Sequence, residues 1–229
     1  MEEPIYGDLH VHTSRSDGLD DPRTVVEFAR RKGLRVLAVT DHDTVAGGVE
    51  AARYGGRDII VIPGVEVSSR DGHILCLGVE EEPRLKGARA EDVVEWCRSR
   101  GGVIVYAHPF GYLLRASTVP RSRIEEVARI VDAIEAINGR TFARFNAEAI
   151  RLARSLGKPM TAGSDAHVAK QVGSVRCVVR REVSSVDDVL RAVRAGQVDP
   201  LGPMPRALDV VASIVGRRIE LVLRKLGVL

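Results

Sequence analysis

The segment Ile5-Tyr6-Gly7-Asp8-Leu9-His10-Val11-His12 places a carboxylate and two imidazoles at every second position. Successive side chains of a β-strand point to opposite faces, so Asp8, His10 and His12 are expected in a row on one side of a strand. The apolar residues between them would face the opposite way, into packing. Two imidazoles in such a row can bind the same ion, and the segment therefore predicts a strand that ends in a metal site.

All six histidines of the chain lie in short motifs of this kind. Beyond the first motif they are His42 in TDHD, His73 in DGHIL, His108 in AHP and His167 in GSDAH. Mixed nitrogen and oxygen ligands suit Zn, Mn or Fe, whereas Ca and Mg prefer oxygen alone. None of these motifs contains cysteine, which argues against a closed structural zinc site and favours an open catalytic one.

Short apolar runs alternate with amphipathic helical segments along the chain. The expected strands are 5–10, 36–40, 59–65, 74–77, 103–107, 133–137, 159–162 and 175–179. The expected helices are one that Asp21 caps, which runs from Pro22 and is closed by Gly33, and those at 91–100, 122–131, 142–156 and 186–195. Largely apolar strands of this length suit a parallel sheet covered by helices on both sides.

This alternation predicts an α/β fold, with seven or eight βα units that form a single small barrel of the TIM type. The motif residues fall at or just after strand ends, where barrel enzymes carry their catalytic groups. A doubly wound open sheet is the alternative, but it would not bring the first, middle and last strands together. We expect the barrel over residues 1–198. Residues 199–229 would be a Pro/Gly linker and an amphipathic helix, at 208–226, that packs on the barrel or on a partner.

Composition and charge set modest limits. The 34 Lys and Arg residues against 31 Asp and Glu residues give a net charge of +3, too small to indicate a nucleic-acid partner. No signal peptide and no apolar run of membrane-spanning length is recognisable, so no membrane association is expected. The three cysteines are odd in number and unpatterned, which is typical of reduced core residues in a cytoplasmic protein.

Six motifs between residue 8 and residue 167 together resemble the motif set of a known family. In order they are DLHVHTSRSDG, TDHDT, PGVEVSS, HILCLG, YAHPFG and GSDAH. This is the polymerase and histidinol phosphatase (PHP) family of metal-dependent phosphoesterases. The resemblance implies a distorted (β/α)7 barrel with three metal ions, and it implies that Glu66 bridges two of them. The implied ligands are His10, His12, Glu66 and Asp165 for one ion, Glu66, His73 and His108 for the second, and Asp17, His42 and His167 for the third.

Some of these residues also have a plainer interpretation. An isolated histidine such as His108 is more often a core or turn residue than a ligand. Asp17 and Asp71 both precede glycine, as in ordinary turns. The family position assigns Asp17 to the metal site, whereas Asp71 is interpreted as a turn residue. Asp8 and Asp41 are expected to orient imidazoles and not to bind ions themselves.

The predicted activity is hydrolysis of phosphate esters by water that three divalent Mn, Zn or Fe ions activate, without a covalent nucleophile. The residues expected to carry the chemistry are His10, His12, Glu66, Asp165 and His167. Basic residues in or after the motif loops are candidates for binding substrate phosphate. Arg140 is the first choice and Lys170 the second, and Arg15 and Arg115 are further candidates.

The run TDHDTVAGG followed by PGVEVSS is most similar to stand-alone nucleotide and oligonucleotide phosphoesterases of the family. The expected substrate is therefore a small phosphorylated molecule such as a nucleoside 3′,5′-bisphosphate or a short oligonucleotide. Only 34 residues separate His73 from His108, which leaves little room for the inserted domain that those enzymes often carry. The alternatives are a histidinol-phosphate phosphatase, an amidohydrolase-like C–N hydrolase and a non-catalytic metal-binding partner domain. A homo-oligomer is compatible with the sequence, and no stable nucleic-acid complex is expected.

Overall fold

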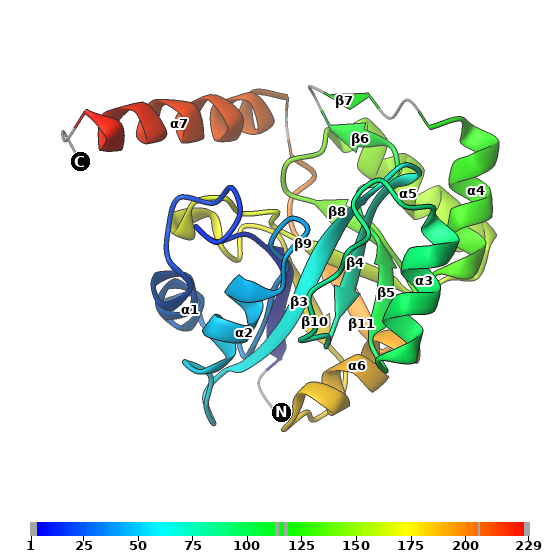
Figure 1. The fold of residues 1–229 in the computed structure, drawn as a ribbon, viewed down its shortest axis with the longest axis horizontal. Helices are drawn as coiled ribbons and strands as arrows, with labels where there is room; N and C mark the ends of the chain where they lie inside the picture. Colours follow the sequence, from blue (N-terminus) through cyan, green and yellow to red (C-terminus); the bar gives the residue numbers. More distant parts are fainter. Residues whose placement is uncertain (1–3, 113–114, 117–118, 206, 227–229) are drawn as a thin grey trace.

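A computed structural model describes residues 4–112, 115–116, 119–205 and 207–226. One large sheet forms a nearly closed barrel, with helices packed around its outer surface (Figure 1). The strand order in this sheet is β11-β10-β1-β2-β3-β4-β5-β8-β9. The expected α/β barrel is therefore confirmed, although the pairing of its strands is mixed and not purely parallel.

The strands of the large sheet are β1 (Ile5–Val11), β2 (Val36–Val39), β3 (Ile60–Ser69), β4 (Gly72–Leu77), β5 (Val103–Tyr106), β8 (Ala133–Asn138), β9 (Met160–Gly163), β10 (Arg176–Val179) and β11 (Val198–Leu201). A small separate hairpin consists of β6 (Gly111–Tyr112) and β7 (Arg115–Ala116). The helices are α1 (Pro22–Arg31), α2 (Ala46–Ala52), α3 (Ala90–Ser99), α4 (Arg121–Ile130), α5 (Ala143–Ser155), α6 (Val186–Arg194) and α7 (Ala207–Lys225).

The barrel closes where β1 meets the loop that follows β9. The His12 N–H donates to the Ala166 carbonyl oxygen and the Asp165 N–H donates to the His10 carbonyl oxygen, both at 2.9 Å. A Cβ atom on Gly163 would lie 2.3 Å from the His10 Cβ, so β9 can approach β1 only with glycine at this position. The closing hydrogen bonds are thus made by the same motif segments that carry the candidate metal ligands.

Strand β4 runs antiparallel to both of its neighbours, β3 and β5. No helix separates β3 from β4, in contrast to the regular βα units expected from the sequence. His73 lies near the start of β4, and the reversed direction of this strand brings it to the rim at which β3 and β5 end. Strand β3 also continues to Ser69, beyond its expected end at Val65, so Glu66 lies within the strand.

Strand β1 does not alternate regularly, as the sequence analysis had assumed. Its register against β2 shifts between Asp8 and Val11. Leu9 packs in the core with Ala38 and Leu75, whereas Val11 packs in a different core with residues of α1. The expected single row of Asp8, His10 and His12 is wrong for Asp8, because the irregularity separates its carboxylate from the two imidazoles.

The helices cover the sheet as their apolar stripes predict. In Figure 1, α1 and α2 lie on one side of the strands, and α3 and α4 lie on the other. Asp21 caps α1 as expected, since its side chain accepts a hydrogen bond from the Thr24 N–H. Helix α2 was not expected, because Gly47 and Gly48 make its sequence a poor helix. Their small size lets α2 pack tightly, since a Cβ on Gly48 would lie 2.8 Å from the Gly64 nitrogen.

The C-terminal segment contains the expected helix, as α7, but differs from the expected linker. Residues 198–201 form β11, which pairs with β10, so the expected linker begins as a strand. Helix α7, drawn in red along the top of Figure 1, exposes large apolar side chains: Leu208 is 80%, Ile219 is 54% and Leu226 is 69% exposed. Packing of this helix on a partner stays a prediction, as does the division of the chain after residue 198. Within the described parts of the chain, no helix is both long and apolar enough to cross a membrane.

Asp8 joins β1 to the segments that follow β9. Its carboxylate is fully buried and accepts hydrogen bonds from the Ser164 N–H at 2.9 Å, the Ser164 hydroxyl at 2.5 Å and the Gly173 N–H at 2.8 Å. Burial raises the pKa of Asp8 to about 6, although these hydrogen bonds oppose the shift. Asp8 therefore fastens the barrel closure. Among the described residues its carboxylate accepts from the backbone N–H of His10 and not from an imidazole ring.

We predict that Asp8→Asn destabilises the metal-free protein by about 1–3 kcal/mol at pH 7.5, because the amide group would face backbone N–H donors. A carboxyl whose pKa is raised in the folded state gains stability as the pH falls through that pKa. The free energy of unfolding of the wild type should therefore rise below about pH 6, and that of the variant should not rise for this reason. The difference in free energy of unfolding between the two proteins should grow towards pH 5. Urea unfolding measures it, with the exposed Asp199→Asn as the control. Equal unfolding midpoints at both pH values would contradict the assignment.

Candidate metal centre

The six histidines converge at one rim of the barrel. His10 lies in β1 and His73 in the reversed strand β4. The other four, His12, His42, His108 and His167, lie in the segments that follow β1, β2, β5 and β9. Neighbouring ring centroids lie between 4.3 and 6.2 Å apart. Six imidazoles at this spacing form a concentrated set of nitrogen ligands, as their motifs predicted.

Glu66 lies at the centre of this set and directs its two oxygens to different histidines. Oε2 lies 3.2 Å from His10 Nε2 and 3.2 Å from His12 Nε2. Oε1 lies 2.7 Å from His73 Nδ1 and 3.0 Å from His108 Nε2. A carboxylate with this arrangement can contribute one oxygen to each of two neighbouring metal ions.

The electrostatics keep Glu66 ionised although it is only 1% exposed. Burial by itself would raise the pKa of Glu66, but the nearby His42, His10 and His73 imidazoles hold it well below its usual range. The pKa of Asp165 is likewise held well below its usual range, against the effect of burial, by His10 and Arg140. Both carboxylates are therefore available as charged ligands at neutral pH.

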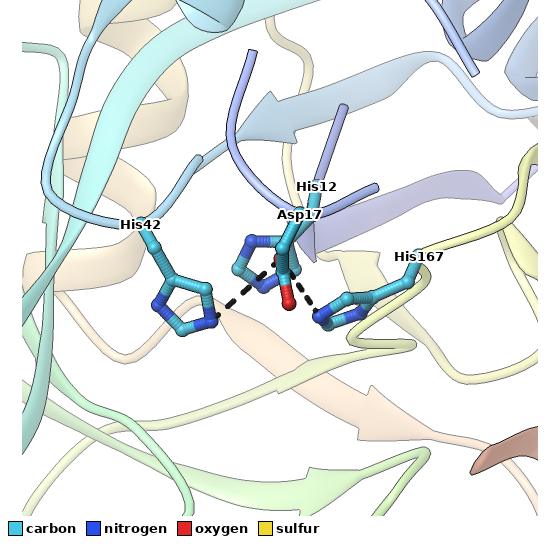
Figure 2. Close-up of side chains that lie close together, drawn as sticks. All are labelled: His12, Asp17, His42 and His167. Atoms are coloured by element: carbon cyan, nitrogen blue, oxygen red, sulfur yellow. Dashed lines mark ion pairs between the residues drawn. The ribbon is translucent and has the colours of Figure 1, made fainter. Parts of the chain in front are cut away.

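A second group of ligands lies beside the first and is shown in Figure 2: His12, Asp17, His42 and His167. Asp17 Oδ1 lies 3.1 Å from His167 Nε2 and 3.9 Å from His42 Nε2. Burial lowers the pKa of His42 and of His167 to about 4, so both rings are neutral at pH 7. Neutral imidazoles offer the lone pairs that metal binding requires.

Backbone turns direct two of the candidate ligands into the site. His108 and Asp165 have φ angles of 27° and 52°, in the left-handed region that such residues rarely adopt. Asp165 Oδ1 lies 3.3 Å from His12 Nε2 and 4.0 Å from His10 Nε2. Unusual backbone conformations of this kind concentrate at functional sites, where the surrounding structure maintains them.

The residues present fit divalent metal ions. His10 Nε2 and His12 Nε2 face each other at 3.1 Å, and both face Glu66, an arrangement that a shared cation would satisfy. The nine expected ligands all belong to groups whose ligand atoms lie within 4.8 Å of one another. These groups do not follow the expected sets throughout, since His42 also groups with Glu66 and His73. The assignment of each ligand to a particular ion therefore stays a prediction.

Glu135 is a buried acidic residue of the site that the sequence analysis missed. Its Oε1 lies 2.9 Å from His10 Nδ1, and its Oε2 accepts hydrogen bonds from the His108 N–H at 2.9 Å and from Asn138 Nδ2 at 3.0 Å. A carboxylate that holds the far nitrogen of a histidine ligand fixes its ring orientation and tautomer. The available signal was a single charge inside the apolar strand AIEAIN of β8.

Asp41 and Asp71 stabilise loops near the ligand cluster. Asp41, expected to orient an imidazole, instead accepts hydrogen bonds from the Thr13 N–H at 2.8 Å and the Ser16 hydroxyl at 2.5 Å. It thus shapes the loop that carries Asp17. Asp71 lies in the turn between β3 and β4, as expected, and forms a two-point ion pair with Arg123 at 2.9 and 2.8 Å.

The basic residues expected to bind phosphate differ in position. Arg140 is 7% exposed, and its Nη1 lies 2.7 Å from His167 Nδ1 and 3.6 Å from Asp165 Oδ1, directly at the ligand cluster. Lys170 instead pairs with Glu220 of α7 at 3.0 Å, on the surface. Arg15 pairs with Glu50 at 2.5 Å. The side chain of Arg115 lies outside what the structure describes.

Comparisons with known proteins agree with this geometry. The family model of the PHP domain matches residues 8–158, and that of the PHP-associated family matches residues 143–198. An uncharacterized protein of Methanocaldococcus jannaschii is 31% identical over 124 residues, which cover 49% of this chain and 72% of that protein. The 3′,5′-nucleoside bisphosphate phosphatase of Chromobacterium violaceum is 31% identical over 180 residues, which cover 75% of this chain and 61% of that enzyme.

A similar fold occurs in a crystal structure of a two-domain protein from Bacteroides vulgatus that contains a predicted PHP-like metal-dependent phosphoesterase. The TM-score is 0.74 at 18% identity, over 94% of this chain and 70% of that one. At this identity the similarity concerns the fold. The family match, in contrast, spans five of the six candidate ligand motifs, up to residue 158, and the barrel strands that carry them. The chain therefore belongs to the PHP domain family of phosphoester hydrolases.

Proposed function

We propose that this protein hydrolyses phosphate esters of nucleotides or short oligonucleotides at a centre of three divalent transition-metal ions. The observation that carries the proposal is the position of Glu66, whose Oε1 faces His73 and His108 and whose Oε2 faces His10, His12 and His42, all at 2.7–3.2 Å. A carboxylate so placed is suited to bridging two ions. The adjacent group around Asp17, which shares His12 and His42 with other groups, would supply ligands for a third.

The proposed ligand sets are those that the motifs imply. His10, His12, Glu66 and Asp165 would hold one ion, Glu66, His73 and His108 a second, and Asp17, His42 and His167 a third. Bound ions would neutralise phosphate oxygens and lower the pKa of a water molecule towards neutrality. Mn, Zn and Fe fit the mixed nitrogen and oxygen donors best.

The protein groups around the ligands would orient them and bind the substrate. Glu135 holds His10 through its Nδ1 atom at 2.9 Å and thereby leaves Nε2 free to face the site. Arg140 lies against His167 and Asp165, and its guanidinium group could donate two hydrogen bonds to a phosphate of the substrate. Lys170 is less suited to this role, because it pairs with Glu220 at the surface.

A nucleotide substrate is supported by the similarity to the nucleoside bisphosphate phosphatase of C. violaceum, of which this chain spans 61%. The segment between His73 and His108 contains β4, α3 and β5 and no inserted domain. The ligand cluster is therefore not covered by an insertion at this place. We propose a small phosphorylated substrate that reaches the rim with a terminal phosphate.

We predict close to three transition-metal ions per chain after purification without chelator and reconstitution with Mn or Zn. The reason is that four overlapping groups of possible ligands, which together contain all nine expected residues, converge at the rim. Elemental analysis by mass spectrometry measures the content, with chelator-treated protein as the blank. Two ions or fewer per chain after reconstitution would rule out the trinuclear centre.

We predict that Glu66→Gln lowers the rate of phosphoester hydrolysis by roughly 100-fold or more, because the amide cannot supply two anionic oxygens to neighbouring ions. The shape of the side chain is nearly unchanged, but the buried imidazoles lose the anion that they face, so the metal-free protein should be destabilised by about 3 kcal/mol. The exposed Glu27→Gln on α1 is the matched control. A Glu66→Gln variant that retains wild-type activity and metal content would show that Glu66 is not the bridge.

We predict direct attack of water on phosphorus. A single turnover in ¹⁸O-labelled water should place the label in the released phosphate, and the rate should rise with pH and level off near neutrality. Mass spectrometry of the phosphate and of the protein separates this route from covalent catalysis. A trapped phosphoprotein would overturn the mechanism, and cleavage of amides without cleavage of any phosphate ester would overturn the proposed function.

A further inference from the structure

Helix α7 lies outside both family matches, which end at residues 158 and 198, yet it contacts the candidate metal centre. The contact is made by Arg217, whose Nη2 lies 3.0 Å from Asp17 Oδ2 and also donates to the Asp17 carbonyl oxygen. The other Asp17 oxygen, Oδ1, faces His167 at 3.1 Å. Arg217 therefore contacts Asp17 on the side away from the other ligands of its group.

Asp17 is the candidate ligand that its own surroundings hold least firmly. Its side chain is 41% exposed, whereas His42 is 24% and His73 is 12% exposed, and the side chains of the other six candidates are at most 6% exposed. It comes from a turn after β1 and not from a strand. A carboxylate in this position needs an additional contact if it is to keep one orientation, and Arg217 supplies that contact.

Helix α7 also contacts the barrel through a second charged side chain. Apart from Arg217, Glu220 pairs with Lys170 at 3.0 Å, and Lys170 follows the motif that contains His167. Val210, near the start of the helix, is fully buried, whereas Ile219 and Val222, close to Arg217 and Glu220, are more than half exposed. In this part of the helix the two ion pairs are specific contacts to the two loops that carry Asp17 and His167.

We propose that Arg217 is a positioning residue of the metal centre: it engages Asp17 Oδ2 and so directs Oδ1 towards the ion that His42 and His167 share. Hydrogen bonds that orient a metal ligand from outside typically contribute 10- to 100-fold to metal affinity. The C-terminal helix would thus complete the third metal site. This inference rests on the proposed trinuclear centre and adds to it a residue outside the motif set.

The test is equilibrium dialysis of the full chain against stepped concentrations of free Mn²⁺, with the bound metal measured by elemental analysis. We expect Arg217→Ala to retain two ions at wild-type affinity and to bind the third about tenfold or more weakly. Arg217→Lys, which keeps the charge but loses the planar fork of donors, should give an intermediate loss. Arg218→Ala, an exposed arginine next to it on the helix, should match the wild type.

Two further variants separate positioning from simple docking of the helix. Glu220→Gln breaks the ion pair of α7 with Lys170, away from Asp17, and should leave the affinity for the third ion within about twofold of the wild type. Asp17→Asn should itself weaken the third ion, and addition of Arg217→Ala to it should cause little further loss. Non-additivity of this kind is the signature of two residues that act through one contact.

The possible failures are distinguishable. A wild-type protein that binds fewer than three ions would overturn both the proposed function and this inference. Three ions at wild-type affinity in Arg217→Ala would overturn the inference alone. In that case a raised KM for a phosphate ester with an unchanged kcat would assign Arg217 to substrate binding. Equal loss of the third ion in Glu220→Gln would attribute the effect to docking of α7 and would also overturn the positioning role.

Discussion

A buried carboxylate stays ionised only when positive charge or hydrogen-bond donors surround it, and Glu66 meets this condition with imidazoles alone. Its two oxygens each lie within 3.2 Å of histidine nitrogens from different strands. In the absence of metal, the imidazoles compensate its charge. The imidazole nitrogens that compensate the charge of Glu66 are also those that would bind the ions. The stability of the ionised carboxylate and the metal-binding geometry therefore depend on the same residues.

This arrangement depends on how the barrel is built. The reversal of β4 brings His73 to the rim, and the hydrogen bonds between β1 and the segment after β9 bring the first and last motifs into contact. Asp8 fastens this closure from a fully buried position. The functional rim and the closure of the fold therefore share residues, and changes to one are expected to disturb the other.

The outer layer of the site shows that charged residues beyond the ligands have distinct tasks. Glu135 orients His10 from inside the barrel, Asp41 shapes the loop after β1, and Arg217 holds Asp17 from outside. Interactions of this type determine which ring nitrogen and which carboxylate oxygen face an ion. The last of them comes from helix α7, beyond residue 198, where the family matches end.

The sequence by itself determined the barrel class, most of the strands and helices, and the residue types of the candidate ligands, because these depend on local periodicity and short motifs. Only the tertiary structure decided that Asp8 closes the barrel, that Glu135 supports His10, and that α7 turns Arg217 towards Asp17. The irregularity in β1 and the continuation of β3 through Glu66 concern the register between strands, and the reversal of β4 concerns strand direction. Register depends on contacts between residues far apart in the chain, which no local pattern specifies.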